Sequence, residues 1–409
     1  MSPMVKKLSY TAALLFLSIF TISLQAQEWK LMEDPPFHKH HSNGFGIDGI
    51  AYVMEGVYRN DGPNDASAEV WTFNPDGQEW TRIGDFPGPD RGLAIGDDWE
   101  GKYYYGFGAR GDFETLSDLW VFDPADSSWT ELASCPCIGR THPALIAHNG
   151  KVFMGSGSSR GGDLNDWWIY DMASDTWTEG PRMPGVVRHH PFQFGIDEYV
   201  YVGGGHRFDW LRYDDATSSW SDINALPEGR VAGSQFSYEN HGYLLGGDDR
   251  FHVHLPDEET FMRYDPATDE WESLPSLPNG SRWANSSFII GSELFFFGGL
   301  DDDNLRDSSM WMIDLALLDV MTSTRDLEEA SASLRLSPNP ASDFFTIDHD
   351  LDWEVADVLM ESIDGKFQTL ISDHTLSQPI SLSDLPSGLY LVQLQRDGAS
   401  VNRKLMVVR

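Results

Sequence analysis

Short apolar runs rich in aromatic residues recur along the chain up to residue 319, and each run ends in turn residues. In five of these runs an aspartate or asparagine follows the apolar residues, and a tryptophan comes six positions later. The pairs are Asn74 and Trp80, Asp123 and Trp129, Asp171 and Trp177, Asp214 and Trp220, and Asp265 and Trp271. Strand-length runs separated by turn signals predict antiparallel sheets rather than helices.

A sixth run, residues 310–314, ends at Asp314 but has Val320 where the tryptophan is expected. The missing tryptophan is predicted to be Trp29, which lies before the first repeat. An N-terminal strand would then complete the last repeat and close the sheets into a ring, which leaves no open edge to invite aggregation. The pattern therefore predicts an all-β, six-bladed β-propeller over residues 27–319.

Two further features recur in each copy. A basic residue begins the copy, and a glycine-rich doublet follows 15 or 16 residues later, at the end of an apolar run. The doublets are Glu55-Gly56, Gly106-Phe107, Gly155-Ser156, Gly203-Gly204, Gly246-Gly247 and Gly298-Gly299. We expect glycine to supply backbone angles closed to other residues, the tryptophan to fill the wedge between blades, and the acid to form an Asx turn.

The apolar strand, the doublet, the aromatic strand ending in an acid and the tryptophan six positions on together resemble the kelch repeat. The copies depart from that pattern at Glu55, Phe107 and Ser156 in the doublets and at Asn74 in place of the acid. The resemblance implies a kelch-type propeller whose last blade combines strands from both ends of the repeat region.

The tail differs in composition. Residues 320–333 lose the repeat and are predicted to be a polar linker, and residues 334–409 are predicted to form a small C-terminal β-sandwich. Three motifs mark this tail: Ser337-Pro338-Asn339-Pro340-Ala341, Leu385-Pro386-Ser387-Gly388-Leu389-Tyr390 and Lys404-Leu405-Met406-Val407-Val408-Arg409. They resemble the type A C-terminal sorting domain of the type IX secretion system of Bacteroidota. The resemblance implies translocation by that machinery, removal of the tail, and release or surface anchoring; an unrelated adhesive sandwich is the alternative.

The first residues have the pattern of a secretory signal peptide, which we assign to residues 1–26. Lys6 and Lys7 precede a short apolar run, and Leu24-Gln25-Ala26 suits cleavage before Gln27. The run is too short to favour a membrane-spanning helix, and no later segment is long enough to span the membrane. We therefore expect no transmembrane segment in the mature protein and a location outside the cell or on the outer-membrane surface, reached through the periplasm.

Charge narrows the choice of partner. The 409 residues carry a formal net charge of −36, which repels phosphate backbones and argues against nucleic acid as a ligand. The two cysteines, Cys135 and Cys137, are not at zinc-binding spacing. They are interpreted as thiols or as a local disulfide, in either case without a catalytic role.

The basic residues that begin the copies are the first candidates for ligand binding. They are Lys39, Arg91, Arg140, Arg188, Arg230 and Arg282. At the mouth of the central channel, the five guanidinium groups could clamp a carboxylate or a sulfate. The alternative is that each basic residue pairs with acids on the adjoining loops.

Three histidines stand two positions after basic residues: His41, His142 and His190. Equivalent positions should point into the channel, where imidazoles could hold a metal or exchange protons. The other copies have Leu93, Ala232 and Ala284 there, so we favour a polar lining bridged by water and assign no metal. Calcium at the acidic run 301–304 is left open.

Two functional hypotheses follow. The favoured one is a non-catalytic binding module that takes a protein or a glycan on its loop face, with no cofactor and no catalytic residue. The alternative is a carbohydrate-active enzyme, because some bacterial kelch propellers are sialic-acid mutarotases. Fungal relatives that are copper oxidases give no match, since no Tyr-Cys arrangement or copper-ligand set is found here.

Overall fold

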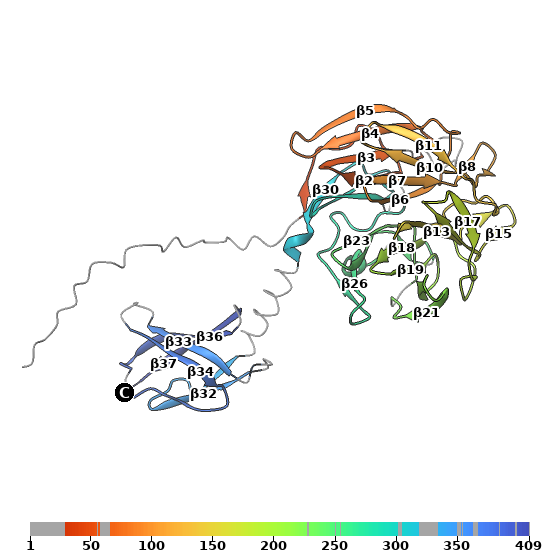
Figure 1. Ribbon diagram of the computed structural model, residues 1–409. Helices are drawn as coiled ribbons and strands as arrows, with labels where there is room; N and C mark the ends of the chain where they lie inside the picture. Colours follow the sequence, from red (N-terminus) through yellow and green to blue (C-terminus); the bar gives the residue numbers. More distant parts are fainter. Residues whose placement is uncertain are drawn as a thin grey trace, which may run out of the picture.

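The computed structural model describes residues 29–54, 56–57, 66–226, 229–249, 251–253, 255–301, 305–318, 334–349, 353, 355–362, 367–383, 385–396 and 399–408 (Figure 1). The expected signal peptide (1–26) and linker (320–333) lie outside these residues. The two parts of the chain on either side of the linker are described separately.

The described residues between 29 and 318 form six four-stranded antiparallel sheets. The first three sheets, from inner to outer strand, are β2 (Asn43–Ile47), β3 (Ile50–Met54), β4 (Glu69–Asn74) and β5 (Glu79–Asp85); β6 (Ile95–Trp99), β7 (Lys102–Gly106), β10 (Leu119–Asp123) and β11 (Ser128–Leu132); and β12 (Ala144–His148), β13 (Lys151–Gly155), β16 (Trp167–Asp171) and β17 (Thr176–Glu179). The other three are β18 (Pro191–Ile196), β19 (Tyr199–Gly204), β20 (Trp210–Asp214) and β21 (Ser219–Ile223); β23 (Ser234–Tyr238), β24 (His241–Leu245), β26 (Phe261–Asp265) and β27 (Glu270–Ser273); and β28 (Ser286–Ile290), β29 (Glu293–Phe297), β30 (Trp311–Asp314) and β1 (Lys30–Leu31).

Short strands and 3₁₀ turns occur in the connections between the main strands. Three two-stranded pairs are β8 (Ala109–Arg110) with β9 (Glu114–Thr115), β14 (Ser158–Ser159) with β15 (Gly162–Asp163), and β22 (Arg230–Val231) with β25 (Asp248–Asp249). Two 3₁₀ turns, η2 (Asp257–Glu259) and η3 (Leu315–Leu317), complete this part.

The six inner strands close a ring. Strands β2, β6, β12, β18, β23 and β28 contact one another in chain order, and β28 contacts β2 again. Just before four of the six inner strands, a backbone N–H donates to the neighbouring blade, as from His142 to the Leu93 carbonyl (3.2 Å) and from Ala284 to the Ala232 carbonyl (2.6 Å). The blades are thus joined at one level of the channel by main-chain hydrogen bonds as well as by packing.

The N-terminal strand closes the last sheet, which confirms the prediction drawn from the missing tryptophan. Lys30 pairs with Met312, and Leu31 pairs with Trp311. The Trp29 indole N–H donates to the Pro275 carbonyl at 3.2 Å. Four of the five repeat tryptophans make the same bond to the preceding blade: Trp80 to Glu33, Trp177 to Ala133, Trp220 to Pro181 and Trp271 to Asn224. Trp29 therefore takes the tryptophan position of the sixth blade.

The acids before the turns form Asx turns, as expected. Their side-chain oxygens accept backbone N–H bonds from residues two or three positions on. The acceptors are Asn74, Asp123, Asp171, Asp214, Asp265 and Asp314.

The glycine doublets need a correction of one residue in three blades. The positions with positive φ are Phe107 and Gly108, Ser156 and Gly157, and Gly204 and Gly205, rather than the doublets named from glycine content. With this shift, the second residue is glycine in every copy and lies 17 residues after the basic residue. In five of the six copies a Cβ there would strike backbone, as at Gly247, where it would lie 2.5 Å from the Val231 oxygen. Glycine is therefore required at the second position, whereas Phe107 and Ser156 occupy the first.

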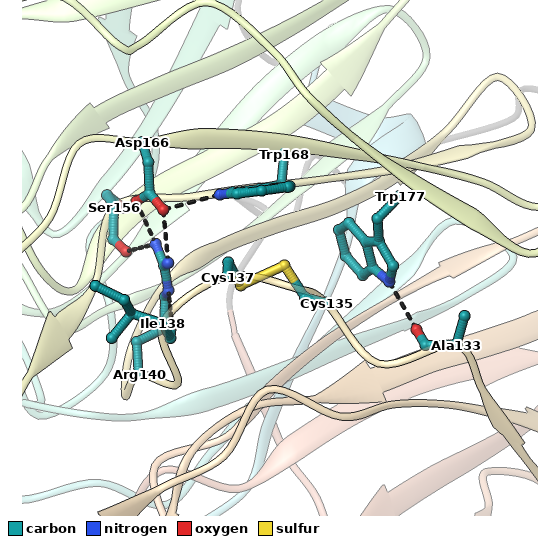
Figure 2. Close-up of a disulfide and its surroundings, with 9 residues drawn as sticks. All are labelled: Ala133, Cys135, Cys137, Ile138, Arg140, Ser156, Asp166, Trp168 and Trp177. Atoms are coloured by element: carbon teal, nitrogen blue, oxygen red, sulfur yellow. Dashed lines mark hydrogen bonds and ion pairs between the residues drawn. A yellow bond between two sulfur atoms is a disulfide. The ribbon is translucent and has the colours of Figure 1, made fainter.

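Cys135 and Cys137 form a disulfide, which decides between the two alternatives left open above. Cys135 is 4% exposed in the connection that follows β11 (Figure 2). The bond closes a very short loop between two blades.

The tail forms two sheets with a common core, so the expected C-terminal sandwich is present. One sheet holds β31 (Arg335–Ser337), β32 (Phe344–Asp348) and β35 (Ile380–Ser381). The other runs in the order β34 (Gln368–Thr375), β33 (Val355–Ser362), β36 (Gly388–Arg396) and β37 (Ala399–Val407). Phe345, Val358 and Leu405 are fully buried between them.

Candidate functional site

The arginines that begin the copies lie inside the blades. All five are at most 2% exposed. Four pair with an acid of their own blade: Arg91 with Asp118, Arg140 with Asp166, Arg188 with Asp209, and Arg282 with Asp307. Arg230 donates to the Glu259 carbonyl, and Lys39 pairs with Glu69 at 3.4 Å.

Arg140 shows the arrangement in detail (Figure 2). Its Nη1 donates to Asp166 Oδ1 at 2.6 Å and to the Ser156 carbonyl at 2.9 Å. The Trp168 indole N–H also donates to Asp166, at 2.8 Å. Although desolvation acts in the opposite direction, the hydrogen bonds and charge of Arg140, with the Trp168 bond, keep the pKa of Asp166 below its usual value.

The proposed guanidinium clamp at the channel mouth is therefore corrected. The arginines connect the start of their blades to the loops that follow the second strands. Four of them pair with acids there, which was the alternative to ligand binding. Burial lowers the pKa of Arg230 and of Arg282 to about 10, against the raising effect of nearby acids. Both groups remain cationic at neutral pH, and their role in the described structure is to hold loops in place.

The three histidines, in contrast, meet inside the channel. They adopt left-handed backbone angles, with φ of 57° at His41, 47° at His142 and 50° at His190. Leu93, Ala232 and Ala284 share this conformation at the equivalent positions. The six residues are thus structurally equivalent, and three of them are histidines.

Direct contacts join the three imidazoles. His41 Nε2 lies 3.2 Å from His190 Nε2, and the His142 and His190 rings stack with centroids 3.4 Å apart. One ring nitrogen from each residue lies within 4.8 Å of the others. The expected lining bridged by water is therefore replaced by a compact cluster, because the ring of left-handed residues brings even opposite blades within contact distance.

The cluster is neutral and partly enclosed. Desolvation, followed by the charge of neighbouring histidines, holds the pKa of His41, His142 and His190 well below the usual value. Trp283 packs edge-on against His41, with centroids 4.8 Å apart. Among the described residues, Nε2 of His142 is buried and has no hydrogen-bond partner.

Two cavities follow one another along the channel. The first, about 130 Å³, is lined by the three histidines together with Asn43 and Gln235. The second, about 440 Å³, shares Gln235 with it, has Asp97 in its wall and reaches Trp99 and His148 at the other end of the inner strands. Desolvation and the charge of Asp98 raise the pKa of Asp97 well above its usual value, although the Ala147 N–H donates to it at 2.9 Å.

Loops surround the histidine end of the channel. The connections between blades and those between second and third strands lie on this face, because short backbone bridges pair them within five of the six blades, as between Thr141 and Ser158. Of the ten exposed large apolar side chains in the described part of the propeller, seven are on these loops. They are Phe113, Ile138, Val186, Phe208, Phe251, Val253 and Leu305. These seven side chains are exposed on the loops of one face, where they are accessible to a partner.

Further histidines lead from the channel toward these loops. His189 follows the cluster in ring contact with His190 and binds Asp163 at 3.0 Å. His206 contacts both His189 and His252, with centroids 5.0 Å apart in each case. We call His189, His206 and His252 the histidine track.

Comparisons with known proteins support the fold and the tail. The kelch motif matches residues 139–184, and the secretion system C-terminal sorting domain matches residues 335–408. Mouse Kelch domain-containing protein 3 is 27% identical over 158 residues, which is 35% of this chain and 38% of that protein. Mouse Kelch domain-containing protein 7A is 31% identical over 88 residues, 21% of this chain and 10% of that protein. The matches thus span well under two thirds of these relatives.

A solved structure gives the same fold. The chain titled "Structure of YjhT" superposes with a TM-score of 0.55 at 14% identity and covers 68% of this chain and 95% of its own. With the ring of sheets and the repeat contacts, these matches define a β-propeller of the kelch class. The protein is a kelch-repeat propeller that carries a C-terminal secretion sorting domain. A sorting domain of this kind implies export to the cell surface or out of the cell by the secretion system that recognises it.

Within the described part of the chain, no helix has the length and apolar character needed to cross a membrane.

Sequence reasoning missed several residues of this face. His40 and Trp283, which contact His41, and the histidine track were not singled out. A usable signal existed, since His40-His41 and His189-His190 are adjacent pairs at matched positions. The apolar loop tips had no such signal, because single apolar residues in polar loops are common.

Proposed function

We propose that this protein is an exported binding module that recognises a macromolecular ligand, a protein or a glycan, through the loop face around the histidine end of its channel. The observation that carries the proposal is the gathering of exposed apolar side chains there, with Phe251 67% and Leu305 62% exposed. Burial of each such side chain in an interface contributes about 1.5–3 kcal/mol. The mixture of aromatic and aliphatic tips favours a protein partner over a glycan.

The sorting domain supports the route. Export through the periplasm, translocation by the type IX machinery and removal of the tail would leave the propeller outside the cell or on the outer-membrane surface. A large negative charge suits a soluble surface protein and disfavours nucleic acid as the ligand.

Paired variants test the binding face. Phe251→Ser with Val253→Ser removes two exposed tips of one loop, whereas Ile83→Ser changes an exposed residue, 39% accessible, on outer strand β5. Each protein is applied to a glycan array and to the purified surface-protein fraction of the producing cells. We expect the double variant to lose at least about tenfold in affinity, the equivalent of 1.4 kcal/mol, and Ile83→Ser to bind as the wild type does. Equal binding by all three proteins would refute the assignment of the face.

The alternative, a mutarotase-like enzyme, keeps only part of its support. It relied on histidine and arginine at the channel mouth, and the arginines are engaged in their own blades. Anomerisation of free sugars, followed by NMR, with loss of the activity in His190→Ala would favour the enzyme. Variants of Arg188 or Arg230 would not serve in this test, because they remove buried structural contacts.

A further inference from the structure

The geometry points to a divalent transition-metal site in the propeller channel, formed by the imidazoles of His41, His142 and His190 with an open coordination position toward the 130 Å³ cavity. This inference is independent of the ligand proposed for the loop face. It follows from the ligand set, the nitrogen separations, the partner of His41 and the cavity.

The ligand set has a restricted chemistry. Three neutral imidazoles suit Zn²⁺, Cu²⁺, Ni²⁺ or Fe²⁺, whereas Ca²⁺ and Mg²⁺ prefer oxygen ligands. Three protein ligands leave a four-coordinate ion with one exchangeable position, the arrangement of catalytic rather than structural zinc.

The nitrogen separations fit such an ion after small side-chain adjustments. Two imidazoles bound tetrahedrally at 2.0–2.1 Å place their nitrogens about 3.3 Å apart. His41 Nε2 and His190 Nε2 are already 3.2 Å apart. The largest separation among the three ligand nitrogens is within 4.8 Å, so rotation of one ring would complete the site. The stacked His142 ring is the one to turn, since its buried Nε2 has no hydrogen-bond partner among the described residues.

His40 provides the outer contact that metal-bound histidines usually have. Its Nδ1 lies 2.6 Å from His41 Nδ1. When His41 Nδ1 carries the proton and donates it to His40 Nδ1, the Nε2 lone pair of His41 is free and faces His190 Nε2, and the ion would sit between these two atoms. Such an outer partner fixes the tautomer and orientation of the ligand ring.

Residues and space around the three histidines favour the entry of a metal ion and its retention. The cavity next to the cluster has room for water or a small anion at the open position. The histidine track leads from the cluster to His252 on the exposed loop, and Asp163 and Asp248 lie along it.

The repeat itself supplies matched variants. Ala232 and Ala284 occupy the equivalent left-handed positions in the fifth and sixth blades, and Leu93 does so in the second. His142→Ala, His190→Ala and His142→Leu therefore introduce side chains that the ring already accepts at this site. His241→Ala, at the start of β24, removes a histidine outside the cluster and serves as the control.

The test uses the full exported protein without an affinity tag, stripped with chelator and then titrated with Zn²⁺ by calorimetry and with Co²⁺ by absorption. We expect one ion per chain, a tetrahedral Co²⁺ spectrum, and unchanged behaviour of His241→Ala. His142→Ala and His190→Ala should weaken binding by more than the 10- to 100-fold that loss of an outer partner costs. His40→Ala should fall within that range.

Two results would overturn the inference. One is the absence of stoichiometric binding by wild type at micromolar Zn²⁺, and the other is equal binding by wild type and His142→Ala, which would place the ion on surface histidines. Unfolding followed by tryptophan fluorescence verifies the fold of each variant; if His142→Ala unfolds, His142→Leu and the wild-type Co²⁺ spectrum still decide. Loop variants that abolish ligand binding would leave metal binding intact, so the two proposals fail separately.

Discussion

Removal of the Trp29 side chain should destabilise the whole ring, although the residue lies at the edge of the described chain. The indole packs against Phe261 and Phe296, with centroids 5.7 and 6.2 Å away, and donates to the Pro275 carbonyl. A buried tryptophan removes 150–250 Å² from water, worth about 4–6 kcal/mol at about 25 cal/mol per Å². Trp29 is partly exposed, so about 2–4 kcal/mol is expected from packing, and the lost hydrogen bond adds about 1 kcal/mol.

Trp29→Ala should therefore lower the free energy of unfolding by about 3–5 kcal/mol, in the range of large core truncations. Urea unfolding followed by tryptophan fluorescence measures this, since Trp353 is the one tryptophan of the tail among the 15 in the chain. With a slope near 3 kcal/mol/M, the midpoint should fall by about 1 M or more.

Two controls sharpen the experiment. Trp220→Ala removes the equivalent indole from a blade built of one continuous segment, and it should cost a similar amount. Leu31→Ala changes the same strand at a side chain that is 57% exposed and should stay within about 0.5 kcal/mol of wild type. A Trp29→Ala midpoint equal to that of wild type would refute the closing role of the strand.

Three further predictions concern the blades, the channel and the tail. Arg140→Ala should lower the free energy of unfolding by about 3–5 kcal/mol because it leaves Asp166 without its cationic partner. Arg140→Lys should restore only part of this stability, and urea unfolding measures both variants. Binding assays should show that ligand binding per folded molecule is unchanged. Asp97→Asn should stabilise the protein at neutral pH. Folding raises the pKa of Asp97 above 3.8, so the folded state binds a proton that the unfolded state has lost. The free energy of unfolding of the wild type therefore falls as pH rises from 3.8 to the folded pKa, by up to about 1.4 kcal/mol per pH unit. Unfolding curves from pH 4 to 8 should show a smaller change of this free energy with pH in Asp97→Asn, and an unchanged dependence on pH would contradict the account. Deletion of residues 334–409 should leave the propeller inside the cell envelope, which fractionation and immunoblotting check; unchanged surface display would contradict the export route.

The ring could be predicted from sequence because its signals are local. The six-residue spacing from acid to tryptophan reflects one tight turn between two strands, so each copy specifies its own hairpin. The missing tryptophan at Val320 then pointed to Trp29, because a closed ring has one place for it. The predicted positions of the glycine doublets were wrong by one residue in three copies, because they were chosen by glycine content. The requirement is for positive φ, which Phe107 and Ser156 also adopt.

The site was harder to predict because its contacts are not local. Sequence spacing gave the six equivalent positions but not the direction of the arginines, whose acid partners follow at separations between 21 residues for Asp209 and 27 for Asp118. His41 and His190 are 149 residues apart in the chain and meet only because the ring is narrow at this level. The absence of histidine from the intervening second copy argued against a cluster in the sequence, whereas in the structure the side chains meet across the channel.

The most direct test of the account is a map of where the ligand touches the propeller. Hydrogen exchange gives that map when it is measured by mass spectrometry on the full exported protein, with and without the partner found on the glycan array or in the surface-protein fraction. The account predicts protection in the connections that carry Ile138, Phe208 and Phe251, with unchanged exchange in the turns at the opposite end, such as the one between β4 and β5. Protection confined to those opposite turns or to the outer strands would contradict the assignment of the loop face.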